Sequence, residues 1–173
     1  MKQNKHVLPL MSAALMVSSI SSAFAAETVY EALATGTASG NVNLRYESVS
    51  QDNTLQDASA LTLRTRIGYQ TADLSGWSVG VEFEDSRIVM GQGDYTVGPT
   101  GYNLGEYSVI ADPETTELDQ AFVQYKNENL TLKVGRQVIA LDGQRFVGHV
   151  GWRQDRQTFD GATVIYQAND KLK

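Results

Sequence analysis

Hydrophobic and polar residues alternate with a period of two along most of this chain. The clearest run lies at residues 61–70, where one set of alternate positions is mostly apolar and the other mostly polar. Successive side chains of a β-strand point to opposite faces, so this pattern predicts a strand with one apolar face. Similar runs predict strands at residues 39–47, 77–84, 120–125, 130–135 and 162–167. The chain therefore favours an all-β fold of six antiparallel strands.

The connections between these strands alternate between short and long. The predicted turns lie at 72–76, 126–129 and 168, and the longer loops near 50–60, at 86–116 and at 141–156. Outer-membrane barrels alternate in this way, and a tilted strand of about ten residues crosses a bilayer. Aromatic residues of the kind found at membrane interfaces stand near the strand ends: Tyr46, Tyr69, Trp77, Tyr125 and Tyr166. Soluble lipocalin-like barrels and β-sandwiches also alternate, so a soluble periplasmic binding barrel is an alternative.

Residues 1–25 have the features of a secretory signal peptide. Lys2 and Lys5 precede an apolar stretch at 7–17, and Ala23-Phe24-Ala25 is a small-x-small cleavage site. A membrane anchor helix needs about 20 apolar residues, whereas serines interrupt this stretch. Residues 26–38 are then expected to form a short periplasmic leader with one or two helical turns. Residues 39–173 would be the amino-terminal, incomplete part of an outer-membrane barrel.

Arginine side chains fix which face of the strands can meet lipid. Arg64 and Arg66 share one face of the run at 61–70, and an arginine at the bilayer midplane costs roughly 2–4 kcal/mol. We therefore expect both to point inward. The same argument directs inward Arg45, Gln124, Lys133, Glu82 and Glu84. The two glutamates either neutralise Arg64 and Arg66 across the strands or leave guanidiniums unpaired, and unpaired guanidiniums would attract anions.

A second group of charges surrounds the strand at 130–135 and the loop after it. Its members are Arg136, Arg145, Arg153 and Arg156, with Asp142, Asp155 and Asp160. One reading is an ion-pair network that braces a folded-in loop, and the other is a selectivity ring. The residue types fit both readings equally well.

Charge and composition exclude several classes of protein. The net charge of −6 becomes −8 when Lys2 and Lys5 leave with the signal peptide, which argues against nucleic acid or an anionic lipid surface as the partner. The chain has no cysteine, and His149 would be its only remaining histidine. We therefore predict no catalytic triad, no metal site of cysteines or histidines, no cofactor and no enzymatic activity. Six strands are also fewer than the eight of the smallest membrane barrels, which predicts a larger barrel.

Five segments carry a recognisable order of residues: "ASGNVNLRYE", "DASALTLRTRIGYQT", "VEFEDSRIV", "IADPETTELDQAFVQY" and "VGRQVIALDGQRFVGHVGWRQDRQTFDG". Together they span nearly all of residues 38–165 and resemble the alginate-export family of bacterial outer-membrane porins. The last segment is the most specific, because its "GRQ", "QRFVG", "GWRQ" and "TFDG" elements follow the family's order and spacing. The resemblance implies a monomeric, many-stranded barrel with a basic lumen for an acidic polysaccharide. It also implies lumen-facing or loop-bracing roles for Arg136, Arg145 and Arg153.

The sequence thus predicts the first six strands of a larger up-and-down transmembrane β-barrel, surrounded by lipid in the bacterial outer membrane. The predicted function is a porin that passively conducts anionic solutes, from a small anion to a polyuronate such as alginate. The residues predicted to line its pore are Arg45, Arg64, Arg66, Lys133, Arg136, Arg145 and Arg153. The alternative is a structural or adhesive barrel with a plugged lumen.

Overall fold

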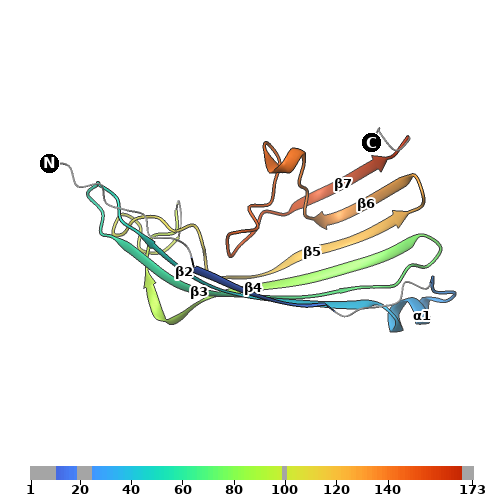
Figure 1. Cartoon of the computed structure of the whole chain (residues 1–173), viewed down its shortest axis with the longest axis horizontal. Helices are drawn as coiled ribbons and strands as arrows, with labels where there is room; N and C mark the ends of the chain where they lie inside the picture. The colour runs from blue at the N-terminus through green and yellow to red at the C-terminus, as the bar shows by residue number, and fades with distance from the viewer. Residues whose placement is uncertain (1–10, 19–24, 99–100, 169–173) are drawn as a thin grey trace.

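The structure, a computed structural model, describes residues 11–18, 25–98 and 101–168. Its strands form one antiparallel sheet in chain order (Figure 1). They are β1 (Met11–Ser18), β2 (Thr37–Val49), β3 (Ala58–Gln70), β4 (Trp77–Asp94), β5 (Thr115–Lys126), β6 (Leu130–Gln137) and β7 (Phe159–Tyr166). The short helices are α1 (Val29–Ala34) and η1 (Asp142–Gln144). The predicted all-β, up-and-down order is confirmed by β2 to β7, and the sheet is open, with edges at β1 and β7.

Strand β1 lies within the segment that the sequence assigns to a signal peptide. It pairs with β2 along its whole length, from Met11 opposite Tyr46 to Ser18 opposite Ser39. Residues 1–10 and 19–24 of that segment fall outside the described residues, and the signal peptide stays a prediction. If cleavage occurs after Ala25, β2 loses this neighbour and its outer backbone groups become an unpaired edge.

Strand β4 is longer than the sequence predicts. The predicted loop at 86–116 is wrong in its first part, because β4 continues to Asp94 and pairs with β3 as far as Ser59. The glycines of this stretch suggested a loop, but they bend a strand instead: Met90 and Gly91 have φ of 55° and 65°. The register of β3 and β4 also shifts between Ala60 and Thr62, as at a β-bulge. The loop proper is therefore residues 95–114.

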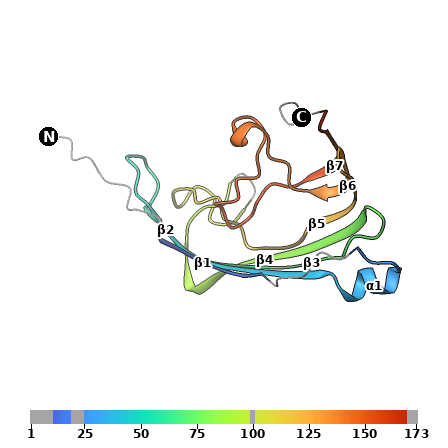
Figure 2. The same cartoon turned by 45° about the vertical axis from the view of Figure 1, so that its right-hand side comes forward.

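The short connections lie at one end of the sheet and the long ones at the other. The short turns at 71–76 and 127–129 lie at the end where α1 sits, and the loops at 50–57 and 95–114 lie at the opposite end (Figure 1). Strands β5 to β7 rise out of the plane of β2 to β4, which gives the sheet a concave side (Figure 2). Residues 138–158, here called the inner loop, stand over that concave side. The predicted alternation of short and long connections is confirmed.

Helix α1 confirms the helical turns expected in residues 26–38. The Oγ1 atom of Thr28 accepts a hydrogen bond from the backbone N–H of Glu31 at 3.1 Å and so caps the helix. The hydroxyl of Tyr69 donates to the carbonyl of Leu33, and the N–H of Ala72 donates to Ala32 at 2.9 Å. The helix is thereby held against the ends of β3 and its turn. No helix in the described part of the chain is long and apolar enough to cross a bilayer.

Loop 95–114 is anchored by a small hydrophobic cluster at the long-loop end. Tyr95 and Ile110 are fully buried against Ala58 and Ala60 of β3. The Tyr95 hydroxyl also donates to the backbone carbonyl of Asp112 at 2.6 Å. These contacts fix the position of Asp112, whose carboxylate reaches the polar face of the sheet.

Two glycines that face each other across β6 and β7 give a matched test of this register. Gly135 has φ of 127°, and a Cβ there would lie 2.2 Å from the carbonyl oxygen of Ala121, whereas a Cβ at Gly161 would meet open space. We expect Gly135→Ala to lower the free energy of unfolding by at least about 1–3 kcal/mol, from backbone strain alone. Gly161→Ala should leave it unchanged or raise it by about 0.4–1 kcal/mol. Urea unfolding of both variants measures the difference, and equal effects would contradict the register.

Candidate functional site

The polar side chains of the central strands are buried, and the apolar ones between them are more exposed. On β3, Arg64 and Arg66 are only 4% and 8% exposed, whereas Ile67 is 65% exposed. On β2, Arg45 is 1% exposed and its neighbour Leu44 is 43% exposed. This order is the reverse of a water-soluble protein, in which a sheet buries its apolar face. The inner face of the sheet is therefore the charged one, as predicted for Arg45, Arg64 and Arg66.

The opposite face carries a continuous apolar surface across β2 to β7. Its exposed members include Val42, Leu44, Tyr46, Ile67, Trp77, Val79, Phe83, Val123, Val134, Val164 and Tyr166. At the short-turn end, the rings of Trp77 and Tyr125 pack against each other in a tilted arrangement, with centroids 5.1 Å apart. At the long-loop end the surface finishes at two ion pairs, Arg87 with Asp85 and Arg136 with Asp160, both at 2.8 Å. An apolar band with aromatic residues at its border is typical of the lipid face of outer-membrane barrels.

The first charged group on the inner face joins β2 to both long loops. Arg45 contacts Glu47 at 2.5 Å and Asp112 at 3.2 Å, and Arg153 of the inner loop contacts the same two carboxylates at 2.8 and 3.6 Å. The ring of Trp152 lies under both guanidiniums, 5.0 and 4.3 Å from their central carbons. Two arginines and two acids here neutralise each other almost completely. The arrangement braces the loops.

The second charged group joins β3, β4 and β5 to the inner loop. Arg66 pairs with Glu84 on the next strand and lies 3.9 Å from Asp119. Arg156 of the inner loop pairs with both Glu82 and Asp119. Asp119 is fully buried at a register shift of β4 and β5, where Glu82 stands opposite Gln120 and Phe83 opposite Leu118. The sequence correctly places Arg66 beside Glu84, but Glu82 takes its partner from the inner loop.

Arg64 differs from the other arginines of the inner face. It stands opposite Ser86, and no carboxylate of the described residues lies within salt-bridge distance of it. Its Nη1 and Nη2 atoms donate to the carbonyl of Arg153 at 2.9 Å and to Oδ1 of Asn41 at 2.7 Å. Its Nε atom is buried and has no hydrogen-bond partner among the described residues. Arg64 is thus held in place by neutral groups, and its charge is not cancelled by direct contact.

Gln154 is a residue of this site that sequence reasoning missed. It is fully buried, and its amide donates to the carbonyls of Asn43 and Thr62 and to the Thr62 hydroxyl, at 2.9–3.2 Å. Its backbone N–H donates to Asp112 at 3.0 Å. A glutamine inside a polar loop gives no sequence signal for burial. Its contacts nevertheless fix the inner loop to the backbone of β2 and β3.

The remaining predicted site residues lie apart from these groups. Lys133 places its ammonium 4.0 Å from the centroid of the Phe122 ring. Arg145 is exposed near the tip of the inner loop. Arg136 does not have the expected inward position. It lies two residues after Val134 on β6, and its partner Asp160 lies two residues before Ala162 on β7. Both therefore stand in the row of the apolar face, and Gly135 and Gln137 occupy the inner row.

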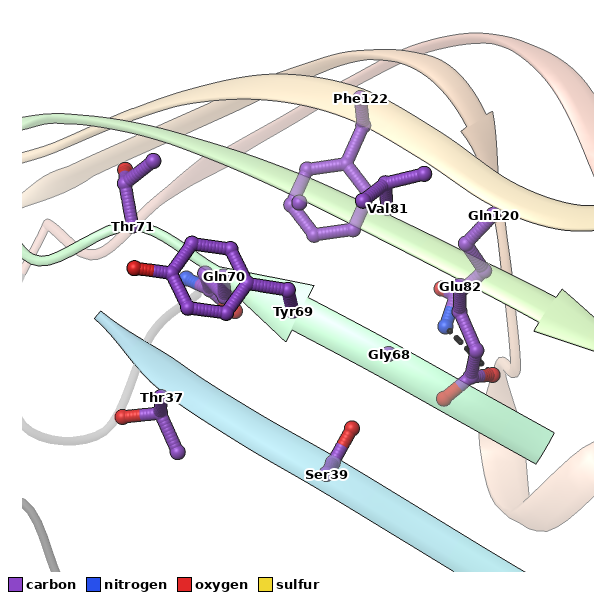
Figure 3. A pocket seen from close by; sticks show the side chains of 11 residues that line it. Thr37, Ser39, Gly68, Tyr69, Gln70, Thr71, Val81, Glu82, Gln120 and Phe122 are labelled. Atoms are coloured by element: carbon purple, nitrogen blue, oxygen red, sulfur yellow. Dashed lines mark hydrogen bonds between the residues drawn. The ribbon is translucent and has the colours of Figure 1, made fainter. Parts of the chain in front are cut away.

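Open volume remains on the inner face near the short turns. A cavity of about 380 Å³ lies over β2 to β5, and none of its lining residues belongs to the inner loop (Figure 3). It is hollow where Gly68 and Gly80 carry no side chain, and the ring of Phe122 lies beside Gly80. Gln120 donates to Glu82 at 3.4 Å along its wall. The inner loop thus covers only part of the charged face.

The chain forms an up-and-down sheet with a buried charged face and an exposed apolar face. Outer-membrane transport barrels combine these two features. The family model described as alginate export matches residues 30–171, and the chain belongs to that family. This confirms the resemblance found in the sequence. Members of the family are transport proteins rather than enzymes and are generally found in the outer membrane. No curated protein and no solved structure matches the chain.

The two charged groups predict how firmly the inner loop is held. Removing Arg156 would leave Glu82 and the buried Asp119 without their partner, and breaking a buried pair on one side costs roughly 3–5 kcal/mol. We expect Arg156→Ala to raise hydrogen exchange at residues 150–157 by at least about a hundredfold, which corresponds to about 2.7 kcal/mol. Arg145→Ala, at the exposed tip, should leave exchange within about threefold of the parent protein. Similar exchange in both variants would contradict the bracing role.

Proposed function

We propose that this protein forms part of a bacterial outer-membrane channel that passively conducts anionic solutes. In this proposal the exposed apolar face contacts lipid, the charged inner face lines an aqueous passage, and further strands close the open sheet. The observation that carries it is the burial pattern of β3, on which Arg64 and Arg66 are shielded while Ile67 is exposed. In water this pattern would expose apolar side chains to solvent at a cost in free energy. In a bilayer the apolar face contacts lipid and the charged face is kept away from it.

Arg64 supplies the anion preference in this proposal. Arg45, Arg66, Arg153 and Arg156 all contact carboxylates, so most of their charge is balanced locally. Arg64 contacts none among the described residues, and the groups that it bonds are neutral oxygens. Only 4% of Arg64 is exposed and the inner loop lies over it, so in this proposal its charge acts on anions in the passage through its field and not by direct contact.

The family indicates the class of cargo. Membership of the alginate export family supports a role in the export of an acidic polysaccharide across the outer membrane. A polyuronate presents one carboxylate per sugar, so a positive field on the passage would attract it along its whole length. The cavity beside Glu82, Gln120 and Phe122 gives the inner face the open volume that such a chain needs. We propose a polyuronate such as alginate as cargo, with smaller organic anions as the general substrate class.

One observation favours a barrel with a plugged lumen. The inner loop stands over the concave face and is tied to it by Gln154, Arg153 and Arg156. A loop held so firmly would block a passage if it filled the whole section. The cavity near the short turns shows that it leaves part of the face uncovered. Conductance measurements separate a channel from a plugged, structural or adhesive barrel.

Removal of Arg64 is the direct test of the channel. At an effective dielectric constant of about 20, a unit charge stabilises an anion by about 1 kcal/mol at roughly 15 Å, so Arg64→Ala should lower the anion-to-cation permeability ratio by about fivefold. Arg64→Lys keeps the charge and should lower the ratio less. The matched control is Arg87→Ala, because Arg87 is half-exposed in the row of the apolar face.

The measurement is single-channel recording in planar bilayers, with protein expressed from its complete reading frame. A conducting channel whose anion preference survives Arg64→Ala would reject the assigned role of Arg64. A protein that inserts but does not conduct would reject the channel and support the plugged barrel.

Two neighbouring residues of β5 test whether the apolar face meets lipid. Val123 is 45% exposed in the apolar row, and Gln124 lies in the inner row beside Lys133. Val123→Arg should destabilise the folded protein in lipid vesicles by about 2–4 kcal/mol, and Gln124→Arg by much less. If the face met water, an arginine at Val123 would change stability by only about 0.5 kcal/mol. Urea titrations in vesicles distinguish the two cases.

A further inference from the structure

Three carboxylates from different parts of the chain meet on the inner face of the sheet. Glu84 comes from β4, Glu117 from β5 and Asp155 from the inner loop, and one oxygen of each lies within 4.8 Å of the others. Glu84 stands directly opposite Glu117 in the register of β4 and β5. Like charges directly opposite each other on one face destabilise a sheet. The arrangement therefore needs a positive charge between them.

The protein's own cations supply only part of that charge. Arg66 bonds to Oε2 of Glu84, and no salt bridge of the described residues involves Glu117 or Asp155. Asp119 takes Arg156 as its partner and also lies 3.9 Å from Arg66, so it competes with this group for the charge of Arg66. Counting direct bonds, three carboxylates with one guanidinium have a net charge of −2 (−3 + 1), and the nearby charge of Arg64 offsets only part of it. A divalent cation would neutralise that charge.

A second observation points to a ligand at the same place. Glu84 is 1% exposed, and its other oxygen, Oε1, is buried without a hydrogen-bond partner among the described residues. A buried carboxylate oxygen normally accepts at least one hydrogen bond, because desolvation without a partner is costly. A cation bound between the three carboxylates would supply the missing partner of this oxygen.

We propose that Glu84, Glu117 and Asp155 bind a calcium ion that ties the inner loop to β4 and β5. Carboxylate oxygens are the ligands of hard cations, and oxygens on opposite sides of Ca²⁺ lie up to about 5 Å apart. Mg²⁺ requires shorter bonds in a near-ideal octahedron, whereas Ca²⁺ accepts irregular sets and fills them with water. The ion would be structural: Asp155 belongs to the loop that Arg153 and Arg156 already brace.

The test is a calorimetric titration of the purified, folded full chain with Ca²⁺ near neutral pH. We expect one site per chain with a dissociation constant of about 10⁻⁴–10⁻³ M, the range of extracellular calcium modules. Glu117→Gln and Asp155→Asn should each weaken binding at least about tenfold, because each removes a charged ligand. Asp142→Asn is the matched control, since Asp142 is exposed in the same loop and outside the cluster.

Glu84→Gln is not used, because it would also remove the partner of Arg66 and disturb the fold. Far-UV circular dichroism establishes that each variant has folded before it is titrated. No saturable binding to the parent protein below about 10 mM Ca²⁺ would overturn the proposal and indicate that the carboxylates share protons instead. Unchanged binding in both ligand variants would also overturn it. Equal or tighter binding of Mg²⁺ would reject calcium as the ion.

Discussion

The alternation of guanidinium and aliphatic side chains on β3 is the constraint on which the rest of the structure depends. Arg64 and Arg66 are separated by a single residue, so they share a face, and Ile67 must then take the other. A slip of one residue would exchange the two faces completely. Because β3 pairs along its length with both β2 and β4, its register sets theirs. The inner row of the whole sheet follows from this one strand.

A charged inner face requires a polar layer above it, and the inner loop provides one. A soluble sheet would be covered by apolar side chains, but here Arg153, Gln154 and Arg156 reach down to carboxylates and backbone carbonyls. Each contact satisfies a group that burial would otherwise penalise. Such a network contributes little net stability compared with an apolar core, but it defines one position for the loop. The loop is therefore a fixed part of the site.

Local patterns predicted the strands and most of their faces, and contacts between distant residues supplied what the sequence missed. Period-two alternation located β2 to β7 and put Arg45, Arg64 and Arg66 on the inner face. The glycines near Gly91 led to a predicted end of β4 that is too early, because glycine occurs both in loops and at bends inside strands. Gln154 is buried by two strands more than 90 positions away in the chain, and no local pattern records that.

The buried arginines of the inner face differ in what each guanidinium contacts. An arginine that bonds a carboxylate contributes almost no field beyond its own pair, so Arg45 and Arg66 hold the structure together without attracting a distant anion. Arg64 shares their face and burial but bonds only to neutral oxygens, so no direct contact cancels its charge. Residue type and face are the same for Arg64 and Arg66. They differ in the residue that stands opposite on β4, which is Ser86 for Arg64 and Glu84 for Arg66.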